Sequence, residues 1–120
     1  MSAPAGLYNL VADQGSTFSR TILWKDPAKK AINLNGYTAR MQIRPSIDSD
    51  TVTLELTTEN GGIILEDATG TITLYISDET MITIPEHKYV YDLELISSDT
   101  DVYIYKLLYG NFAVRPEVTR

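Results

Sequence analysis

The sequence contains no cysteine and only one histidine and one tryptophan among its 120 residues. Without cysteine there is no disulfide framework, no thiol nucleophile and no thiolate metal site. Cysteine usage therefore does not indicate whether the protein works in an oxidising or a reducing compartment. A zinc or iron site uses several histidine or cysteine ligands, whereas His87 stands alone in a predicted turn. The sequence therefore predicts no metal and no cofactor.

Motifs for catalysis are also lacking, since the sequence has no GxSxG turn, no phosphate-binding loop and no GxGxxG segment. Asp92 and Glu94 would share one face of a strand, about 7 Å apart, a separation that suits the carboxylates of an inverting glycosidase. Alternate polar positions of a half-exposed strand carry charge by default, however, and a sandwich of this length leaves no room for a substrate cleft. We therefore predict no catalytic residues and a protein that is not an enzyme.

Positive charge is scarce: the sequence has 10 Lys and Arg residues and 16 Asp and Glu residues, which gives a net charge of −6. The basic residues are spread out, whereas nucleic-acid binding needs a basic face, so nucleic acid is not an expected partner. No apolar run approaches the roughly 20 residues that span a bilayer, so membrane insertion is not expected. The N-terminus lacks the basic and apolar regions of a signal peptide, which predicts synthesis in the cytoplasm.

Residues that favour β-strands are abundant: Thr, Ile and Val make up about a quarter of the chain, and there are eight tyrosines. Apolar and polar residues alternate with period two in several segments, which indicates strands with one buried face. The alternation is clear in residues 37–44, 51–57, 71–76 and 89–96, and weaker in residues 16–25 and 102–109.

Seven or eight strands, separated by turns every 8–12 residues or so, are typical of an antiparallel β-sandwich. The predicted fold is all-β and immunoglobulin-like, with a single sandwich domain over residues 14–120. Ser77 or Asp78 would cap one short helical turn near residues 77–81. Tyr89 or Tyr91 then follows as a candidate for a tyrosine corner, in which the hydroxyl bonds the upstream backbone. The alternative is a core tyrosine with its hydroxyl at the edge.

Residues 1–13 differ from the rest, because an Ala, Pro and Gly stretch precedes an apolar segment that has no partner nearby in the sequence. They form either an edge strand or an arm. An arm could add to a neighbouring subunit's sheet, which would supply backbone bonds and apolar contacts together. Leu7, Tyr8 and Leu10 are therefore candidate partner contacts.

Tyrosines near the C-terminus are the other candidate contacts. Tyrosine suits interfaces because it buries apolar area and keeps a polar tip. The alternation in residues 102–109 places Tyr103, Tyr105 and Tyr109 on one face, together with Leu107. Carbohydrate binding also uses aromatic platforms, although it usually wants exposed tryptophan, and Trp24 is predicted to pack in the core. Contact with other proteins is the favoured interpretation.

Several segments of the chain resemble a family of small virion proteins of tailed bacteriophages, in particular the N-terminal immunoglobulin-like domain of baseplate upper proteins and fibre-attachment proteins. The similarity covers about residues 13–120, and its most specific parts are the LNGYTARMQIR block and the later YDLEL strand. The other segments that carry it are DQGSTF from residue 13, WKD from residue 24, NGGI from residue 60, GNF from residue 110 and VTR from residue 118.

The resemblance implies a non-enzymatic structural protein of the virion, most specifically an adaptor in the tail, baseplate or tail fibre. Its partners would be other phage structural proteins, in a multicopy symmetric assembly. Larger relatives continue into a coiled coil or a receptor-binding region, whereas this sequence stops at Arg120, which favours an adaptor over direct receptor binding. The alternatives are a capsid-decorating or head-to-tail joining protein and, third, a carbohydrate-binding adhesion domain.

Overall fold

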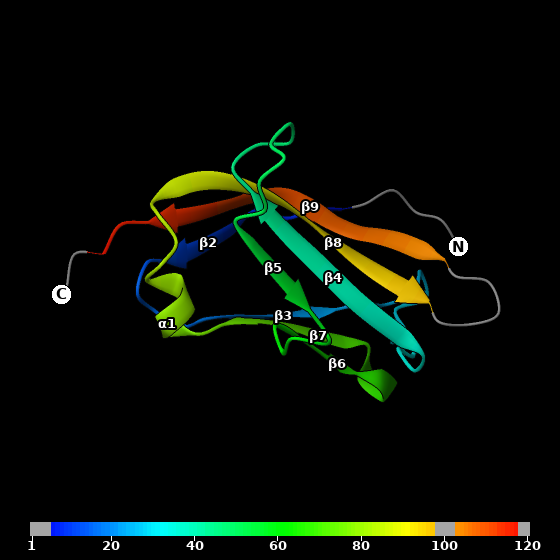
Figure 1. Cartoon of the computed structure of the whole chain (residues 1–120). Coiled ribbons are helices and arrows are strands. Elements are labelled where there is room, and N and C mark those ends of the chain that lie inside the picture. Colours follow the sequence, from blue (N-terminus) through cyan, green and yellow to red (C-terminus); the bar gives the residue numbers. More distant parts are fainter. Residues whose placement is uncertain (1–5, 98–102, 118–120) are drawn as a thin grey trace.

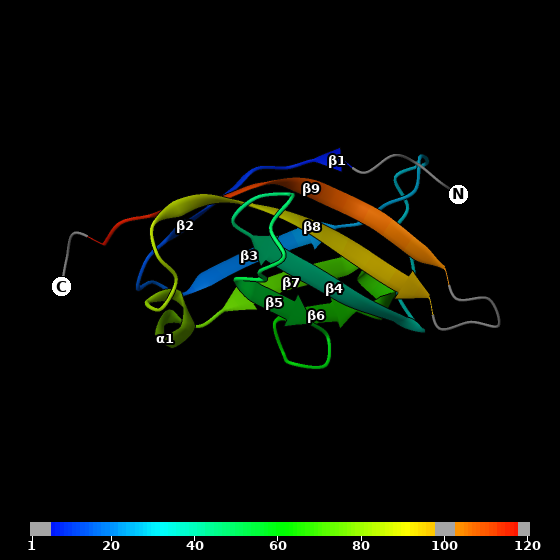
Figure 2. The same cartoon turned by 45° about the horizontal axis from the view of Figure 1, so that its top comes forward.

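The computed structural model describes residues 6–97 and 103–117, which form two packed β-sheets (Figures 1 and 2). The N-terminal part of the predicted arm, the turn before Tyr103 and the final VTR segment lie outside the described residues. The large sheet contains, from one edge to the other, β1 (Gly6–Leu7) and β2 (Leu10–Asp13), both against β9 (Ile104–Arg115), then β8 (His87–Ser97), β4 (Tyr37–Arg44) and β5 (Leu54–Thr57). The small sheet contains β3 (Phe18–Leu23), β7 (Thr71–Ile76) and β6 (Ile63–Glu66).

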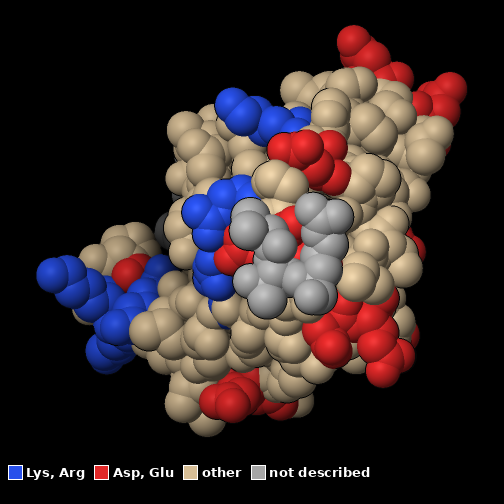
Figure 3. All heavy atoms as spheres, turned by 90° about the vertical axis from the view of Figure 1, so that its left-hand side faces the viewer, with Lys and Arg blue, Asp and Glu red and all other residues tan. Residues whose placement is uncertain are grey.

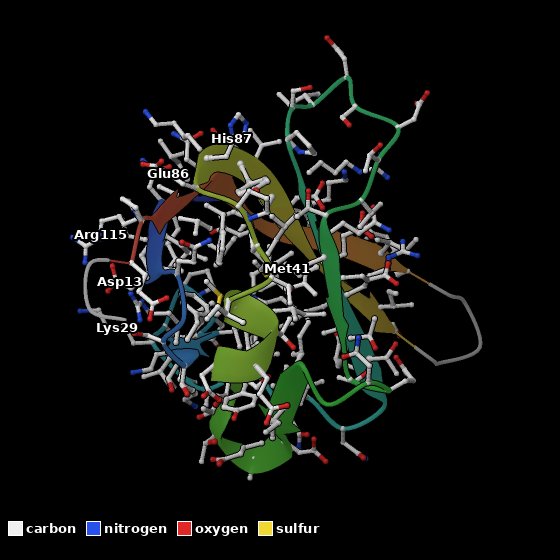
Figure 4. The ribbon with its side chains drawn as sticks, turned by 60° about the vertical axis from the view of Figure 1, so that its left-hand side comes forward. Asp13, Lys29, Met41, Glu86, His87 and Arg115 are labelled. Atoms are coloured by element: carbon white, nitrogen blue, oxygen red, sulfur yellow. The ribbon has the colours of Figure 1, made fainter. Side chains whose placement is uncertain are left out.

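The core lies between the two sheets and is filled by the inward positions of each alternating strand. Met41 of β4 and Leu93 of β8 are fully buried, and Figure 4 shows Met41 inside the molecule. Phe18 of the small sheet meets Phe112 of the large sheet edge to face, with ring centroids 5.1 Å apart. Leu74 of β7 is also fully buried. The prediction of an all-β, immunoglobulin-like sandwich is confirmed.

Strand boundaries follow the sequence pattern closely where alternation is strict, as in β4 and β7. β5 begins at Leu54 rather than at residue 51, and Val52 is 37% exposed in the preceding loop. β6 is a strand that period-two alternation did not single out, because Ile63, Ile64 and Leu65 are consecutive apolar residues. A continuous apolar run fits either a strand or a buried helix, so the pattern alone did not predict the secondary structure of these three residues.

The connection between β7 and β8 contains the predicted helical turn, α1 (Asp78–Met81). Ser77 caps it, because its hydroxyl accepts a hydrogen bond from the Thr80 amide at 3.2 Å. Met81 is fully buried and fixes the turn to the core. At the start of β8, the Tyr89 hydroxyl donates to the Pro85 carbonyl at 2.7 Å, which is the geometry of a tyrosine corner.

The N-terminal strands depart from the antiparallel pattern, because β1 and β2 both pair parallel with β9 of the same chain. Leu10 lies opposite Phe112 and is 2% exposed, so its side chain belongs to the core rather than to a contact surface. At the end of β2, Asp13 and Arg115 form an ion pair of 2.7 Å across the two strands (Figure 4). The Arg115 guanidinium holds the pKa of Asp13 below its usual value.

Candidate interaction surface on the large sheet

The outer face of the large sheet carries a hollow of about 680 Å³, so the prediction that a sandwich of this length has no room for a cleft was wrong. Its floor is formed by β4, β8 and β9, which lie side by side in front of the small sheet in Figure 2. Leu7 of β1 borders it at one edge of the sheet, and Ile47 borders it at the other, on the loop that projects from the end of β4 (Figure 1). We call this the outer-face hollow.

One row of side chains crosses five of the six strands of the large sheet. Glu55 of β5 pairs with Gln42 of β4, which pairs with Asp92 of β8. Asp92 pairs in turn with Tyr109 of β9, and Tyr109 with Leu7 of β1. Paired residues of neighbouring strands point to the same side of a sheet, so the row runs from an acidic edge to an apolar edge.

The next row along the strands contains Arg40 of β4, Glu94 of β8 and Lys106 of β9. The sequence pattern placed Lys106 and Tyr109 on opposite faces, and this prediction was wrong. The pairing shifts register between Leu93 and Glu94, so that Leu107 is an extra residue in β9. Such a β-bulge reverses the alternation, and both side chains therefore lie on the outer face.

Oppositely charged side chains neutralise one another on the floor of the hollow. The Arg40 guanidinium lies 2.7 Å from Glu94, and the Lys106 ammonium lies 3.1 Å from Asp92 and 3.6 Å from Glu94. The hydrogen bond from Glu94 raises the pKa of Arg40, and the hydrogen bond from Asp92 raises the pKa of Lys106. The floor therefore presents fixed donors and acceptors with little net charge.

Arg44 fastens the projecting loop to the same face. Its guanidinium donates to the Ser49 carbonyl at 2.6 Å and to the Gln42 side-chain oxygen at 2.8 Å. Ile47 is 84% exposed near the tip of this loop. Neither residue stood out in the sequence, because Arg44 occupies an alternate polar position of β4 and Ile47 lies in a PSIDSD segment, which ordinarily forms a solvated loop.

Three of the predicted contact residues lie at the β1 edge of the large sheet, and two of them, Leu7 and Tyr109, line the hollow. Leu7, Tyr8 and Tyr109 are 65%, 40% and 47% exposed, and the Tyr8 amide donates to the Tyr109 carbonyl at 2.9 Å. The Tyr91 hydroxyl donates to the Tyr8 carbonyl at 2.5 Å and ties this edge to β8. We call Leu7, Tyr8 and Tyr109 the N-terminal edge.

Tyr103 and Tyr105 lie elsewhere, beyond the bulge. Tyr105 packs edge to face on Trp24 with ring centroids 5.7 Å apart, and Trp24 packs on Tyr37 at 5.8 Å. Tyr103 is 48% exposed and covers Tyr105, with ring centroids 4.4 Å apart. The structure therefore separates the six predicted contacts: three form the N-terminal edge, two join an aromatic cluster and Leu10 lies in the core.

Outside the outer-face hollow, the described residues contain neither a metal-binding cluster nor a helix that could cross a membrane. On the end that Figure 3 shows, basic side chains lie mostly on the left and acidic side chains mostly on the right, and the two kinds touch at several places. Among residues 6–97 and 103–117, no group of three or more His, Asp or Glu side chains could hold a metal ion. Within the same ranges, no helix is long and apolar enough to cross a membrane.

No protein-family model and no curated protein sequence matches the chain. Among solved structures, it is similar to extracellular domains 3–5 of Drosophila OTK, with 14% identity over 98% of this chain and 35% of that chain and a TM-score of 0.37. It is also similar to the extracellular domain of the voltage-gated sodium channel β4 subunit, with 12% identity over 98% of both chains and a TM-score of 0.42. Parallel homodimers of that domain are described as explaining its role in cell–cell adhesion.

Proposed function

We propose that the protein is a non-enzymatic structural component of a tailed-bacteriophage virion, in the tail, baseplate or fibre attachment, where it joins other phage structural proteins. The observation that carries this proposal is the N-terminal edge, where the exposed side chains of Leu7 and Tyr109 lie opposite each other on neighbouring strands and Tyr8, also exposed, follows Leu7. Exposed tyrosine and leucine in one patch favour protein–protein contact. The resemblance of the LNGYTARMQIR and YDLEL segments supplies the virion context.

The edge offers two kinds of interaction at once. β1 is the outermost strand of the large sheet in this region, so a partner strand can extend the sheet there while Leu7 and Tyr109 supply apolar contacts. A contact this small gives low affinity, and a symmetric assembly with many copies compensates for this through avidity. The chain is synthesised in the host cytoplasm and functions in the particle.

Labelling of purified virions with an antibody against this chain, viewed by electron microscopy, tests the location. Label at the distal tail would support the baseplate or fibre adaptor. Label over the capsid would replace it with the decorating protein, and label at the neck would replace it with the head-to-tail joining protein. A particle without the chain would overturn the virion role altogether.

A paired substitution tests the contact surface. Leu7→Ser with Tyr109→Ser should leave a folded chain that enters virions at a greatly reduced level, because both side chains are exposed and their loss costs the fold little. The matched control is Leu23→Ser with Tyr75→Ser on the outer face of the small sheet, where the two side chains are 55% and 42% exposed. Equal incorporation of both variants would exclude the N-terminal edge as the contact.

A further inference from the structure

We infer that the outer-face hollow is a binding site for a neutral oligosaccharide. This site shares Leu7 and Tyr109 with the N-terminal edge, but it takes a different class of ligand and does not rest on the protein contact proposed above. Three properties of the hollow support the inference: its size, its internally neutralised charge, and an aromatic ring flanked by unused polar groups.

The volume of about 680 Å³ lies within the range of roughly 300–1,000 Å³ that small-ligand sites occupy. A folded partner domain does not fit into such a space, whereas a short chain of sugar rings does. The hollow extends over the neighbouring strands β4, β8 and β9, from Leu7 on one side to Ile47 on the other. An elongated ligand can therefore lie across it.

The charges on the floor favour a polar ligand without net charge. Asp92 and Glu94 are each paired with Lys106, and Glu94 also with Arg40. With Arg44, three cations and two carboxylates line the hollow, so its net charge is small, at +1. A cationic ligand would have to displace Arg40 or Lys106 from Glu94, whose side chain is only 14% exposed, whereas the other three side chains of these pairs are 40–61% exposed. Carboxylate oxygens held in this way still have free lone pairs and accept hydrogen bonds from hydroxyl groups at fixed positions.

Tyr109 supplies the apolar platform that a sugar ring requires. Its side chain is 47% exposed and borders the hollow in the same row as Asp92. Among the described residues, the Tyr109 hydroxyl and the Asn111 side-chain amide have no hydrogen-bond partner, and both line the hollow. An aromatic face with amide and carboxylate groups beside it matches the alternating apolar and hydroxyl surfaces of a saccharide.

An extended peptide is a weaker fit for the same space. Peptides gain affinity on sheets by adding a strand at an edge, where backbone groups are unpaired. β4 and β8 have a neighbour on both sides, and β9 has one at Leu108–Tyr109 and again at Phe112–Arg115, so most backbone groups under the hollow are already paired. The part of β9 that has no outer neighbour, residues 104–107, is an edge of the sheet. A peptide would therefore bind at the edges of the sheet rather than on this face.

Nuclear magnetic resonance titration of the full ¹⁵N-labelled chain tests the inference. The probes are maltohexaose, cellohexaose and chitohexaose, each raised to about 10 mM, because dissociation constants near 1 mM are at the weak end of specific binding. We expect at least one probe to shift the amide signals of residues around Asp92, Lys106 and Asn111 in a saturable way. Tyr109→Ala should weaken that binding about tenfold or more, as loss of a central aromatic contact does. Tyr75→Ala, which removes an exposed tyrosine from the small sheet, should bind as the parent chain does.

Three results would overturn the inference. The first is the absence of saturable shifts with every probe, and the second is a set of shifts located away from the outer face of the large sheet. The third is equal affinity of the parent chain and Tyr109→Ala. Because the measurement uses the isolated chain in solution, failure here leaves the virion labelling unaffected, and failure of the labelling leaves sugar binding unaffected.

Discussion

Lys106 and Tyr109 lie three residues apart in β9, yet both side chains are on the outer face of the large sheet. In a regular strand, residues three apart point to opposite faces. Leu108 pairs with Leu93 and Lys106 pairs with Glu94, which leaves Leu107 without a partner position in β8. The bulge therefore places a cation beside the two carboxylates of β8 and keeps Tyr109 in the row that leads to Leu7.

Deletion of Leu107 tests this role of the bulge. Phe112 and Val114 are buried and hold the C-terminal half of β9 in place, so residues 104–106 should rotate to the opposite face. Tyr105 would then leave Trp24, and Lys106 would point towards the core without a partner. We expect the free energy of unfolding to fall by about 2–4 kcal/mol, the range for a buried unpaired charge and lost packing.

Urea unfolding measures this loss, and the emission of the single tryptophan reports on the Trp24–Tyr105 contact. Deletion of Asp48 is the control, because that residue lies in the projecting loop and outside any strand. We expect the control to change the free energy of unfolding by no more than about 0.5 kcal/mol, as is usual for surface positions. Unchanged stability and emission after deletion of Leu107 would show that β9 adapts to either register.

The sequence pattern predicted the sandwich because burial is periodic in most strands, but it could not locate the bulge. Tyr105 lies at an odd position of β9, whereas the buried residues Phe112 and Val114 lie at even positions. Over a short window, alternation fits either the odd or the even positions of β9 as the buried face. One extra residue is enough to change from one set of positions to the other. In the sequence, the aromatic residues occupy odd positions in the first part of this strand and an even position near its end, and this change was the available signal for the bulge.

The parallel pairing of β1 and β2 with β9 could not be read from the sequence for a different reason. Leu10 and Phe112 are about one hundred residues apart, and nothing local in residues 1–13 specifies which strand they join. The same holds for the hollow, whose lining comes from both ends and the middle of the chain. Residue types suggested Leu7, Tyr8 and Tyr109 as contacts, but only the pairing of distant strands brings them together.

The tyrosine corner should contribute measurably to stability. Tyr89 is 3% exposed, and its hydroxyl bonds the Pro85 carbonyl just before β8. Tyr89→Phe removes this hydrogen bond but keeps the ring, so we expect the free energy of unfolding to fall by about 1 kcal/mol. Tyr75→Phe, at an exposed tyrosine of β7, should have no effect in the same urea unfolding measurement. Equal stability of both variants would mean that the corner bond adds nothing beyond ring packing.

Gly110 permits the close passage of the N-terminal segment over β9. A Cβ atom at this position would lie 2.6 Å from the Tyr8 carbonyl oxygen, which is backbone and cannot move aside without shifting β1. Gly110→Ala should therefore displace β1 and lower the free energy of unfolding by about 1–3 kcal/mol. Hydrogen exchange of the Tyr8 amide, which donates to the Tyr109 carbonyl, should become faster.

Gly6→Ala is the matched control, because Gly6 lies in β1 itself and a Cβ atom there would meet the Leu108 side chain at an ordinary 3.5 Å. We expect this variant to keep both its stability and the slow exchange of Tyr8. If the two alanine variants exchange at the same rate, close approach at Gly110 is not what fixes β1 to the sheet.

Tyr91 should make stability depend on pH in the alkaline range. Burial, with a smaller contribution from Tyr8, raises the pKa of Tyr91 to about 12. In the unfolded chain the pKa of tyrosine is about 10, so the folded state holds its proton more tightly. The resulting stabilisation is fully present below pH 10 and is lost as the pH rises through 12. Between these values, the free energy of unfolding should fall by about 1.4 kcal/mol per pH unit because of this group.

Urea unfolding of the parent chain and of Tyr91→Phe between pH 9 and about pH 11.5 measures this contribution. The variant lacks the hydroxyl that donates to the Tyr8 carbonyl, so it should be less stable at pH 9 and lose stability less steeply above pH 10. Part of the slope should persist, because burial also raises the pKa of Tyr89. Tyr75→Phe should retain the slope of the parent chain. Parallel curves for the parent chain and Tyr91→Phe would show that the Tyr91 hydroxyl ionises equally well in the folded and unfolded states, and that its bond to the N-terminal edge does not hold the proton in place.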